Sequence, residues 1–182
     1  MMEKAKQELE DVVGKHNIVE ESHIDKLPYL QFMMKETLRL HPTLPLLVSH
    51  YPSETCIVGG CTILKGSQIF INVWAILKDP SIWENPLEFN RERFLDIKWD
   101  YSGKDFNKFP FSSSRRICVG IAMVESMVMH SLDTLLHSFD WKLPEGEKLD
   151  LSEKFGIVLK KKLPLVAILT PRLSNVALYE IP

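Results

Sequence analysis

The sequence predicts an α+β fold, mainly α, with small peripheral β-sheets. Apolar residues recur at helical spacing in three segments, residues 1–13, 28–40 and 121–135. Short runs rich in β-branched residues lie between glycine-containing turns at residues 55–73. The chain has 182 residues, which is the size of one domain or of one piece of a larger domain.

The composition is that of an ordinary globular protein. Hydrophobic residues make up 45% and charged residues 25%, and the 22 basic residues nearly balance the 24 acidic residues, so the net charge is −2. Binding of nucleic acid requires a basic surplus or stripe, and the run 160–162 is too short to provide one. We therefore expect no nucleic-acid partner.

Cysteine usage and hydropathy indicate a reduced setting and no membrane anchor in this chain. Cys56, Cys61 and Cys118 have spacings that match neither a disulfide framework nor a paired zinc site. The longest apolar run, residues 69–77, is interrupted by Asn72 and is far shorter than the ~20 residues that span a bilayer. The amino terminus is charged where a signal peptide would be apolar.

The first half of the chain predicts helices. Residues 1–13 predict an amphipathic helix ended by Gly14, and because it opens without a capping residue, we expect an upstream portion to be missing. A short helix is expected at 23–27. A longer helix begins at Pro28 and continues to residue 40. It ends there because Pro42 disfavours α geometry at the preceding residue, His41.

The segments that follow predict short strands and loops. Pro45 makes residues 43–48 extended, and strands are expected at 55–58, 62–64 and 68–73. Residues 79–86 carry two prolines and predict a loop, and a polar loop extends to residue 105. Residues 139–172 predict β-hairpins that close the domain.

Cys118 is a candidate ligand. The pattern places it just inside the start of the helix at 121–135, where unpaired backbone N–H groups and the helix dipole favour a thiolate. Gly120 removes a side chain where a flat ligand could approach the backbone. The alternative is a buried small hydrophobic residue, which is the more common role of a cysteine on a helix.

This segment resembles the haem-binding loop of the cytochrome P450 family, whose pattern is Phe-x-x-Gly-x-Arg-x-Cys-x-Gly. The sequence has Phe111, Ser114, Arg116, Cys118 and Gly120 at those positions. The resemblance implies that the Cys118 thiolate is the axial ligand of haem iron, where it favours O–O cleavage. It also implies that Arg116 pairs with a haem propionate, a role that suits a guanidinium group.

Two further motifs resemble the same family in the same order. Glu36-x-x-Arg39 resembles its Glu-x-x-Arg helix, and the segment ending in Glu92-Arg93-Phe94 resembles its Phe-x-Pro-Glu-Arg-Phe segment. The resemblance implies a buried network of Glu36, Arg39 and Arg93. By itself, Glu and Arg three residues apart on a helix usually form a solvent-exposed pair. The intervening and following residues look most like plant microsomal members.

Other assignments implied by the resemblance have ordinary alternatives. His50 stands at the position where an arginine or histidine of the family commonly contacts the second haem propionate, although a lone loop histidine is usually solvated. Residues 44–48 and 155–158 correspond to segments that line the substrate pocket, and core packing explains their apolar character equally well. His130 and His137, like Cys56 and Cys61, are more easily explained as incidental than as a metal site.

Three positions depart from the family pattern. Ser114 replaces the glycine of the haem loop, Arg91 replaces a proline before Glu-Arg-Phe, and Leu64 replaces a proline before Lys-Gly. A residue other than glycine in a special backbone geometry costs on the order of 1 to 3 kcal/mol, so Ser114 is expected to strain the loop. The lost prolines are expected to make the unfolded chain more flexible.

The resemblance implies that residues 1–182 are the carboxy-terminal portion of a haem-thiolate monooxygenase. Such an enzyme inserts one oxygen atom from dioxygen into an apolar substrate with electrons from an NADPH-dependent reductase, at the cytoplasmic face of the endoplasmic reticulum membrane. The distal helix and membrane anchor of the family lie upstream, so no catalytic residue is assigned in this chain. The alternatives are a non-catalytic truncated product that binds haem weakly or acts as an interaction fragment, and a haem-free domain.

Overall fold

The computed structural model of the chain describes residues 1–95, 101–107 and 110–179. Its α-helices in these residues are α1 (Met2–Val13), α2 (Glu21–Ile24), α3 (Pro28–Leu40), α4 (Val73–Ile76) and α5 (Ile121–Ser138). Its 3-10 helices are η1 (Arg91–Phe94), η2 (Ser114–Arg116) and η3 (Val176–Tyr179). Its strands are β1 (Cys56–Val58), β2 (Cys61–Ile63), β3 (Phe139–Lys142), β4 (Glu153–Lys154), β5 (Lys160–Lys161) and β6 (Ile168–Pro171).

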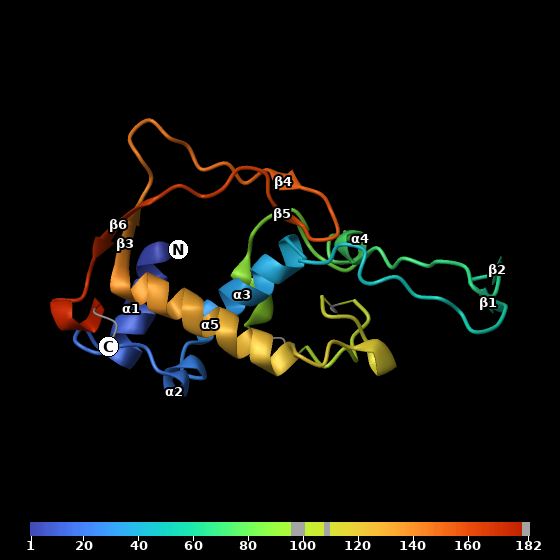
Figure 1. Cartoon of the computed structure of the whole chain (residues 1–182), viewed down its shortest axis with the longest axis horizontal. Helices are drawn as coiled ribbons and strands as arrows, with labels where there is room; N and C mark the ends of the chain where they lie inside the picture. Colours follow the sequence, from blue (N-terminus) through green and yellow to red (C-terminus); the bar gives the residue numbers. More distant parts are fainter. Residues whose placement is uncertain (96–100, 108–109, 180–182) are drawn as a thin grey trace.

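The strands form small antiparallel sheets at the edges of the helical part. Within the described residues β1 pairs with β2, β3 with β6 and β4 with β5. The β4–β5 hairpin therefore lies within the connection between β3 and β6, and the β1–β2 hairpin lies at the end of a long extended segment (Figure 1). The predicted α+β fold, mainly α with small peripheral sheets, is confirmed.

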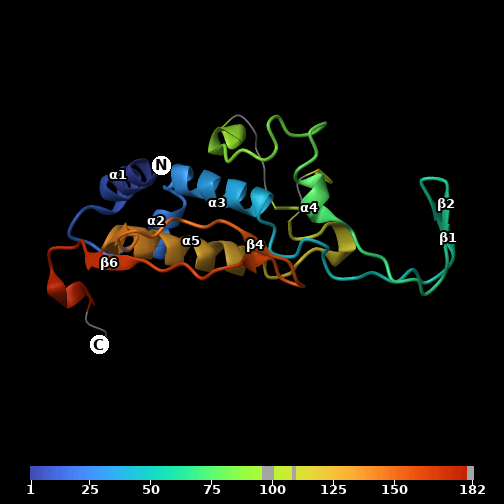
Figure 2. The same cartoon turned by 90° about the horizontal axis from the view of Figure 1, so that it is seen from above.

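Helices α1, α3 and α5 form the main packing unit. Figure 2 shows α1 and α3 in one row with α5 running alongside both. Apolar side chains that share this interior include Ala5 and Leu9 of α1, Leu30 of α3 and Met129 of α5. A second core cluster gathers Val73, Leu77, Trp83, Phe94 and Tyr101 around α4 and η1.

Helix α3 begins where the sequence predicted, and a side chain of α1 caps it. Pro28 occupies the first turn, where a missing N–H is harmless. The Glu8 carboxylate accepts hydrogen bonds from the backbone N–H groups of Tyr29, at 2.8 Å, and Leu30, at 3.1 Å. This contact fixes the direction of α3 relative to α1 and satisfies two of the N–H groups that a helix start leaves unpaired.

Some predicted elements differ from the structure. The prediction of a strand at 68–73 is wrong, because only one bridge, between His50 and Ile69, forms there. The Asn72 side chain instead accepts a hydrogen bond from the Ala75 N–H at 3.0 Å and caps α4. The short helix predicted at 23–27 lies at residues 21–24. Residues 96–100 of the predicted polar loop lie outside the described part.

Candidate functional site

The loop before α5 is closed by its own backbone. The Cys118 N–H donates to the Phe111 carbonyl at 3.0 Å. Within the turn of η2, the Arg116 N–H donates to the Ser113 carbonyl at 3.3 Å and the Ile117 N–H donates to the Ser114 carbonyl at 3.2 Å. The loop thus brings Phe111, Arg116 and Cys118 together.

Cys118 precedes the helix instead of lying inside it. Helix α5 begins at Ile121 with Gly120 as its N-cap, so the prediction that Cys118 lies just inside a helix start is wrong. Residues 117–120 connect η2 to α5, and regular helix geometry begins only at Ile121, where the apolar pattern also begins. The thiol is a free, exposed side chain, which also contradicts the alternative of a buried small hydrophobic residue.

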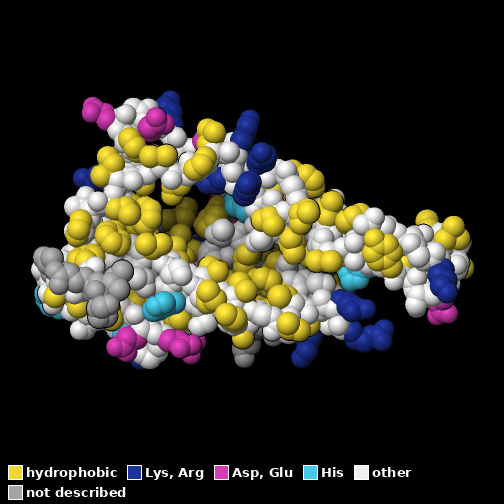
Figure 3. Space-filling model, in the orientation of Figure 1, with side chains coloured by type: hydrophobic (Ala, Val, Ile, Leu, Met, Phe, Trp, Pro, Cys, Tyr) yellow, Lys and Arg dark blue, Asp and Glu magenta, His cyan; other side chains and the backbone are white. Residues whose placement is uncertain are grey.

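The surroundings of the Cys118 sulfur suit a flat, apolar group that takes a thiolate ligand. A Cβ atom at Gly120 would lie 3.9 Å from the Cys118 Sγ, so glycine leaves free the space directly beside the sulfur. Val119 follows Cys118 directly, Met123 and Met127 lie four residues apart on α5, and all three side chains are exposed. Figure 3 shows hydrophobic side chains gathered over the face of the molecule on which α5 lies. The residues present therefore fit haem.

The two candidate propionate partners lie in different segments. Arg116 is exposed on the loop next to Cys118. His50 is half-buried on the extended segment, where its backbone N–H and carbonyl each bond to Ile69 at 2.9 Å. In the part of the chain that the structure describes, no hydrogen bond joins the His50 side chain to the loop.

Two serines of the loop have left-handed backbone geometry. Ser112 has φ of 68° and Ser114 has φ of 54°, a region that side chains other than glycine rarely adopt. Ser114 is the residue that stands at the glycine position of the haem-loop pattern. Glycine adopts this backbone geometry without strain, whereas for serine it costs on the order of 1 to 2 kcal/mol.

Sequence reasoning missed two residues, Tyr101 and Gly103, that pack against the loop. Gly103 has φ of 68°, and a Cβ there would lie 2.9 Å from both the Ser113 Cα and the Ile117 Cδ1. The Tyr101 ring meets the Phe111 ring edge to face, with centroids 5.1 Å apart. A glycine inside a polar segment close to the motif was the available signal. The segment 101–103 thus holds the loop by close backbone approach.

Glu36 and Arg39 form a buried ion pair. The Arg39 Nε donates to one Glu36 oxygen at 2.7 Å and Nη2 donates to the other at 2.8 Å. Both side chains are 0% exposed, so the alternative of a solvent-exposed pair is wrong. The guanidinium also donates to the carbonyls of Leu77 and Pro86, at 2.9 and 2.7 Å, and lies 5.2 Å from the centre of the Trp83 ring.

Arg93 lies next to the same carboxylate. Its Nε is 3.4 Å from Glu36 Oε1, the oxygen that also accepts the Asn90 N–H at 2.8 Å. The other end of the Arg93 guanidinium donates to the carbonyls of Glu84 and Asn85. Glu36, Arg39 and Arg93 together therefore join α3 to the irregular segment 77–94.

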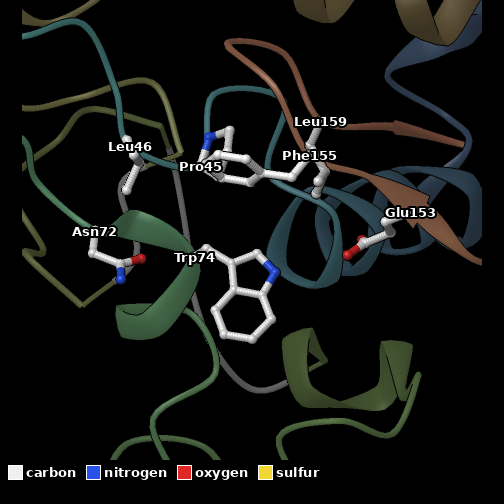
Figure 4. Close-up of a pocket in the computed structure, with 7 residues that line it drawn as sticks. All are labelled: Pro45, Leu46, Asn72, Trp74, Glu153, Phe155 and Leu159. Atoms are coloured by element: carbon white, nitrogen blue, oxygen red, sulfur yellow. The ribbon is translucent and has the colours of Figure 1, made fainter. Parts of the chain in front are cut away.

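An apolar pocket of about 450 Å³ lies between α4 and the β4–β5 hairpin. Figure 4 shows Phe155 and Trp74 on opposite sides of it. The Leu159 N–H donates to the Thr43 carbonyl at 2.9 Å, which brings residues 43–48 next to the segment 155–158. The residues that line it are Pro45, Leu46, Asn72, Trp74, Glu153, Phe155 and Leu159.

Charged groups border this pocket. The carboxylate of Glu153 pairs with the His41 ring, and the Lys78 ammonium lies 3.8 Å from the centre of the Trp74 ring. Burial lowers the pKa of Lys78. Trp74 is a further residue that sequence reasoning missed, because it lies within the apolar run 69–77 and has no motif of its own.

The structure brings together no group of three potential metal-ligating side chains in its described ranges. No such group there includes His130, His137, Cys56 or Cys61. In the same residues, no helix combines the length and the apolar character that crossing a membrane requires.

Comparison with known proteins gives a consistent result. The family model described as Cytochrome P450 matches residues 1–168. A flavonoid 3',5'-hydroxylase of Campanula medium is 46% identical over 177 residues, and a geraniol 8-hydroxylase of Swertia mussotii is 47% identical over 173 residues. A zebrafish cytochrome P450 solved with abiraterone superposes with a TM-score of 0.82 at 30% identity and covers 94% of this chain.

The chain spans about a third of the length of these relatives. The alignments cover 95% and 93% of this chain but 34% and 35% of the two plant hydroxylases, and 39% of the zebrafish protein. The similarity therefore extends over nearly the whole chain and includes the loop, the ion pair and the pocket described above.

Proposed function

The chain belongs to the cytochrome P450 family, and we propose that it provides the haem-thiolate side of a monooxygenase. The observation that carries this proposal is the loop of residues 111–120. It presents the exposed thiol of Cys118 next to the space that Gly120 leaves free. In this proposal the Cys118 thiolate holds haem iron, and bound haem supplies the activation of dioxygen.

In this proposal the other residues of the site bind the haem propionates or keep the loop in position. Arg116 binds one propionate, and its planar guanidinium can do so through two parallel hydrogen bonds. His50 binds the second propionate from the extended segment. The ion pair of Glu36 and Arg39, with Arg93, keeps the segment 77–94 against α3, so that the loop keeps its position.

The substrate in this proposal is an apolar organic molecule. The pocket between α4 and the β4–β5 hairpin is lined mainly by apolar and aromatic side chains, including Pro45, Trp74 and Phe155. The names of two relatives, a flavonoid hydroxylase and a geraniol hydroxylase, support oxygen insertion into such a compound. Electrons come from an NADPH-dependent reductase, and the whole protein acts at the cytoplasmic face of the endoplasmic reticulum membrane.

Haem reconstitution followed by a carbonyl difference spectrum tests the proposal. Thiolate ligation gives a strongly red-shifted band, which hydrophobic binding of haem does not give. We expect this band in the wild-type chain and its loss in Cys118→Ser. Cys61→Ser is the matched control, because Cys61 is also a free, exposed thiol but lies in the β1–β2 hairpin. A red-shifted band that survives in Cys118→Ser would overturn the assignment.

A further inference from the structure

A carboxyl group lies buried in the interior between α1 and α5, away from the loop of residues 111–120. The Asp133 side chain on α5 is 0% exposed. It shares one face of α5 with Met129 and Leu136, which lie four residues before and three residues after it. These two residues belong to the same core cluster as Ala5 and Leu9 of α1. Asp133 is therefore an acidic group among apolar side chains.

Neither carboxylate oxygen of Asp133 has a hydrogen-bond partner among the described residues. An ionised carboxylate in such a place loses hydration without compensation, which costs several kcal/mol. A neutral carboxyl group avoids most of this cost. Burial, with the nearby negative charge of Glu8, raises the pKa of Asp133 to about 7.

The neighbouring elements provide no cation that pairs with Asp133 in the described part of the chain. The Glu8 carboxylate of α1 is held by the N–H groups at the start of α3, so its charge stays close. Lys6 pairs with Asp140 of β3, and His137 Nε2 lies 3.0 Å from the Asn17 carbonyl. Other buried or half-buried charged or titratable groups on these helices are Glu10 of α1, His23 of α2, Lys35, Glu36 and Arg39 of α3, and Glu125 of α5. Arg172, which follows β6, pairs with Glu10.

We propose that Asp133 makes the packing of α1 on α5 dependent on a proton. The neutral carboxyl group is retained between the two helices. Ionisation places an unpaired charge in this interior opposite Glu8, and α1 separates from α5 so that water reaches the carboxylate. The contact between the first helix and α5 is thus a pH-sensitive element of the fold.

The direction of the effect follows from proton linkage. The packed state binds the Asp133 proton more tightly than the open state, so opening becomes easier as the pH rises between the two pKa values. For values of 3.8 and about 7, the opening constant rises roughly 30-fold between about pH 5.5 and about pH 8.5. Above about pH 8.5 the opening constant no longer rises, because Asp133 is ionised in both states.

Hydrogen exchange of the α1 amides in the 182-residue chain measures this constant. Rates are divided by those of the unfolded chain at each pH, which removes the chemical pH dependence of exchange. We expect protection of residues 2–13 to fall roughly 30-fold across that range in the wild type. In Asp133→Asn, which keeps the shape but does not titrate, protection should stay constant. His137→Gln is the control for the other buried titratable group on this face, and it should behave as the wild type.

The result that overturns the proposal is equally direct. If protection of α1 changes by the same factor in the wild type and in Asp133→Asn, the carboxyl group does not control the contact. A pH dependence that disappears in His137→Gln would assign the effect to the histidine. Asp133→Ala serves as a second non-titrating variant if the asparagine variant does not fold.

Discussion

The Arg39 guanidinium binds both oxygens of the Glu36 carboxylate, at 2.7 and 2.8 Å, with both side chains fully buried. The two residues lie one turn apart on α3. Arg39 has further donors directed at carbonyls of the segment 77–88, and Glu36 accepts the Asn90 N–H. One pair of side chains therefore satisfies the backbone of a long segment that has little regular structure.

We predict that Arg39→Ala destabilises the fold by about 3 to 5 kcal/mol. The variant leaves Glu36 as a buried charge whose remaining partners among the described residues are Arg93 and the Asn90 N–H. It also removes the donors to the segment 77–88. Denaturant titration measures the change in the free energy of unfolding. Lys4→Ala, an exposed change on α1, is the control and should cost little. An unchanged denaturation midpoint in Arg39→Ala would contradict the prediction.

We predict that Gly103→Ala weakens the loop more than Gly66→Ala does. Both glycines have positive φ, 68° and 77°, so both variants carry the same kind of backbone strain. A Cβ at position 103 would lie 2.9 Å from the Ser113 Cα, whereas a Cβ at position 66 has no atom within 4 Å. The free energies of unfolding should differ by about 1 to 3 kcal/mol. Equal losses would mean that the segment 101–103 moves away from the loop without cost.

The periodicity of apolar residues predicted the helices well, but it could not reveal which segments lie side by side. Helix α3 begins at Pro28 and ends at Leu40 as predicted, because proline restricts the chain at both ends. The strand expected at 68–73 failed because Asn72 supplies a cap to α4, and a local hydrogen bond prevailed over β propensity.

The sequence pattern predicted which residues form the candidate site, but it did not predict how they are arranged. The pattern of Phe111, Arg116, Cys118 and Gly120 identified the residues of the loop, but it did not show that Cys118 lies in the turn before α5. The role of Gly103 depends on a backbone approach that no spacing rule encodes. In the same way, the burial of Glu36 depends on carbonyls and N–H groups more than 40 residues further along the chain.

We predict that Ser114→Gly slows haem dissociation. Ser114 has φ of 54°, and glycine adopts this geometry without the penalty on the order of 1 to 2 kcal/mol that other residues carry. A more stable loop holds the Cys118 thiolate in place for longer. Transfer of haem to an excess of apomyoglobin measures the dissociation rate. Ser113→Gly is the matched control, because Ser113 has an extended backbone with φ of −146°. Equal rates for Ser114→Gly and the wild type would show that serine is accommodated without strain.

The last prediction concerns catalysis by the 182-residue chain alone. We expect no substrate oxidation even with haem, reductase and NADPH supplied, because the site as the chain forms it is open to water. Cys118 is exposed, as are Val119 and, on α5, Met123 and Met127, and the apolar pocket beside Phe155 opens to solvent. Oxygen activation requires controlled proton delivery and a walled pocket that excludes water. NADPH consumption should therefore appear as peroxide, and product analysis by mass spectrometry should find none. Product that depends on Cys118 and forms in proportion to the NADPH consumed would show that these residues suffice.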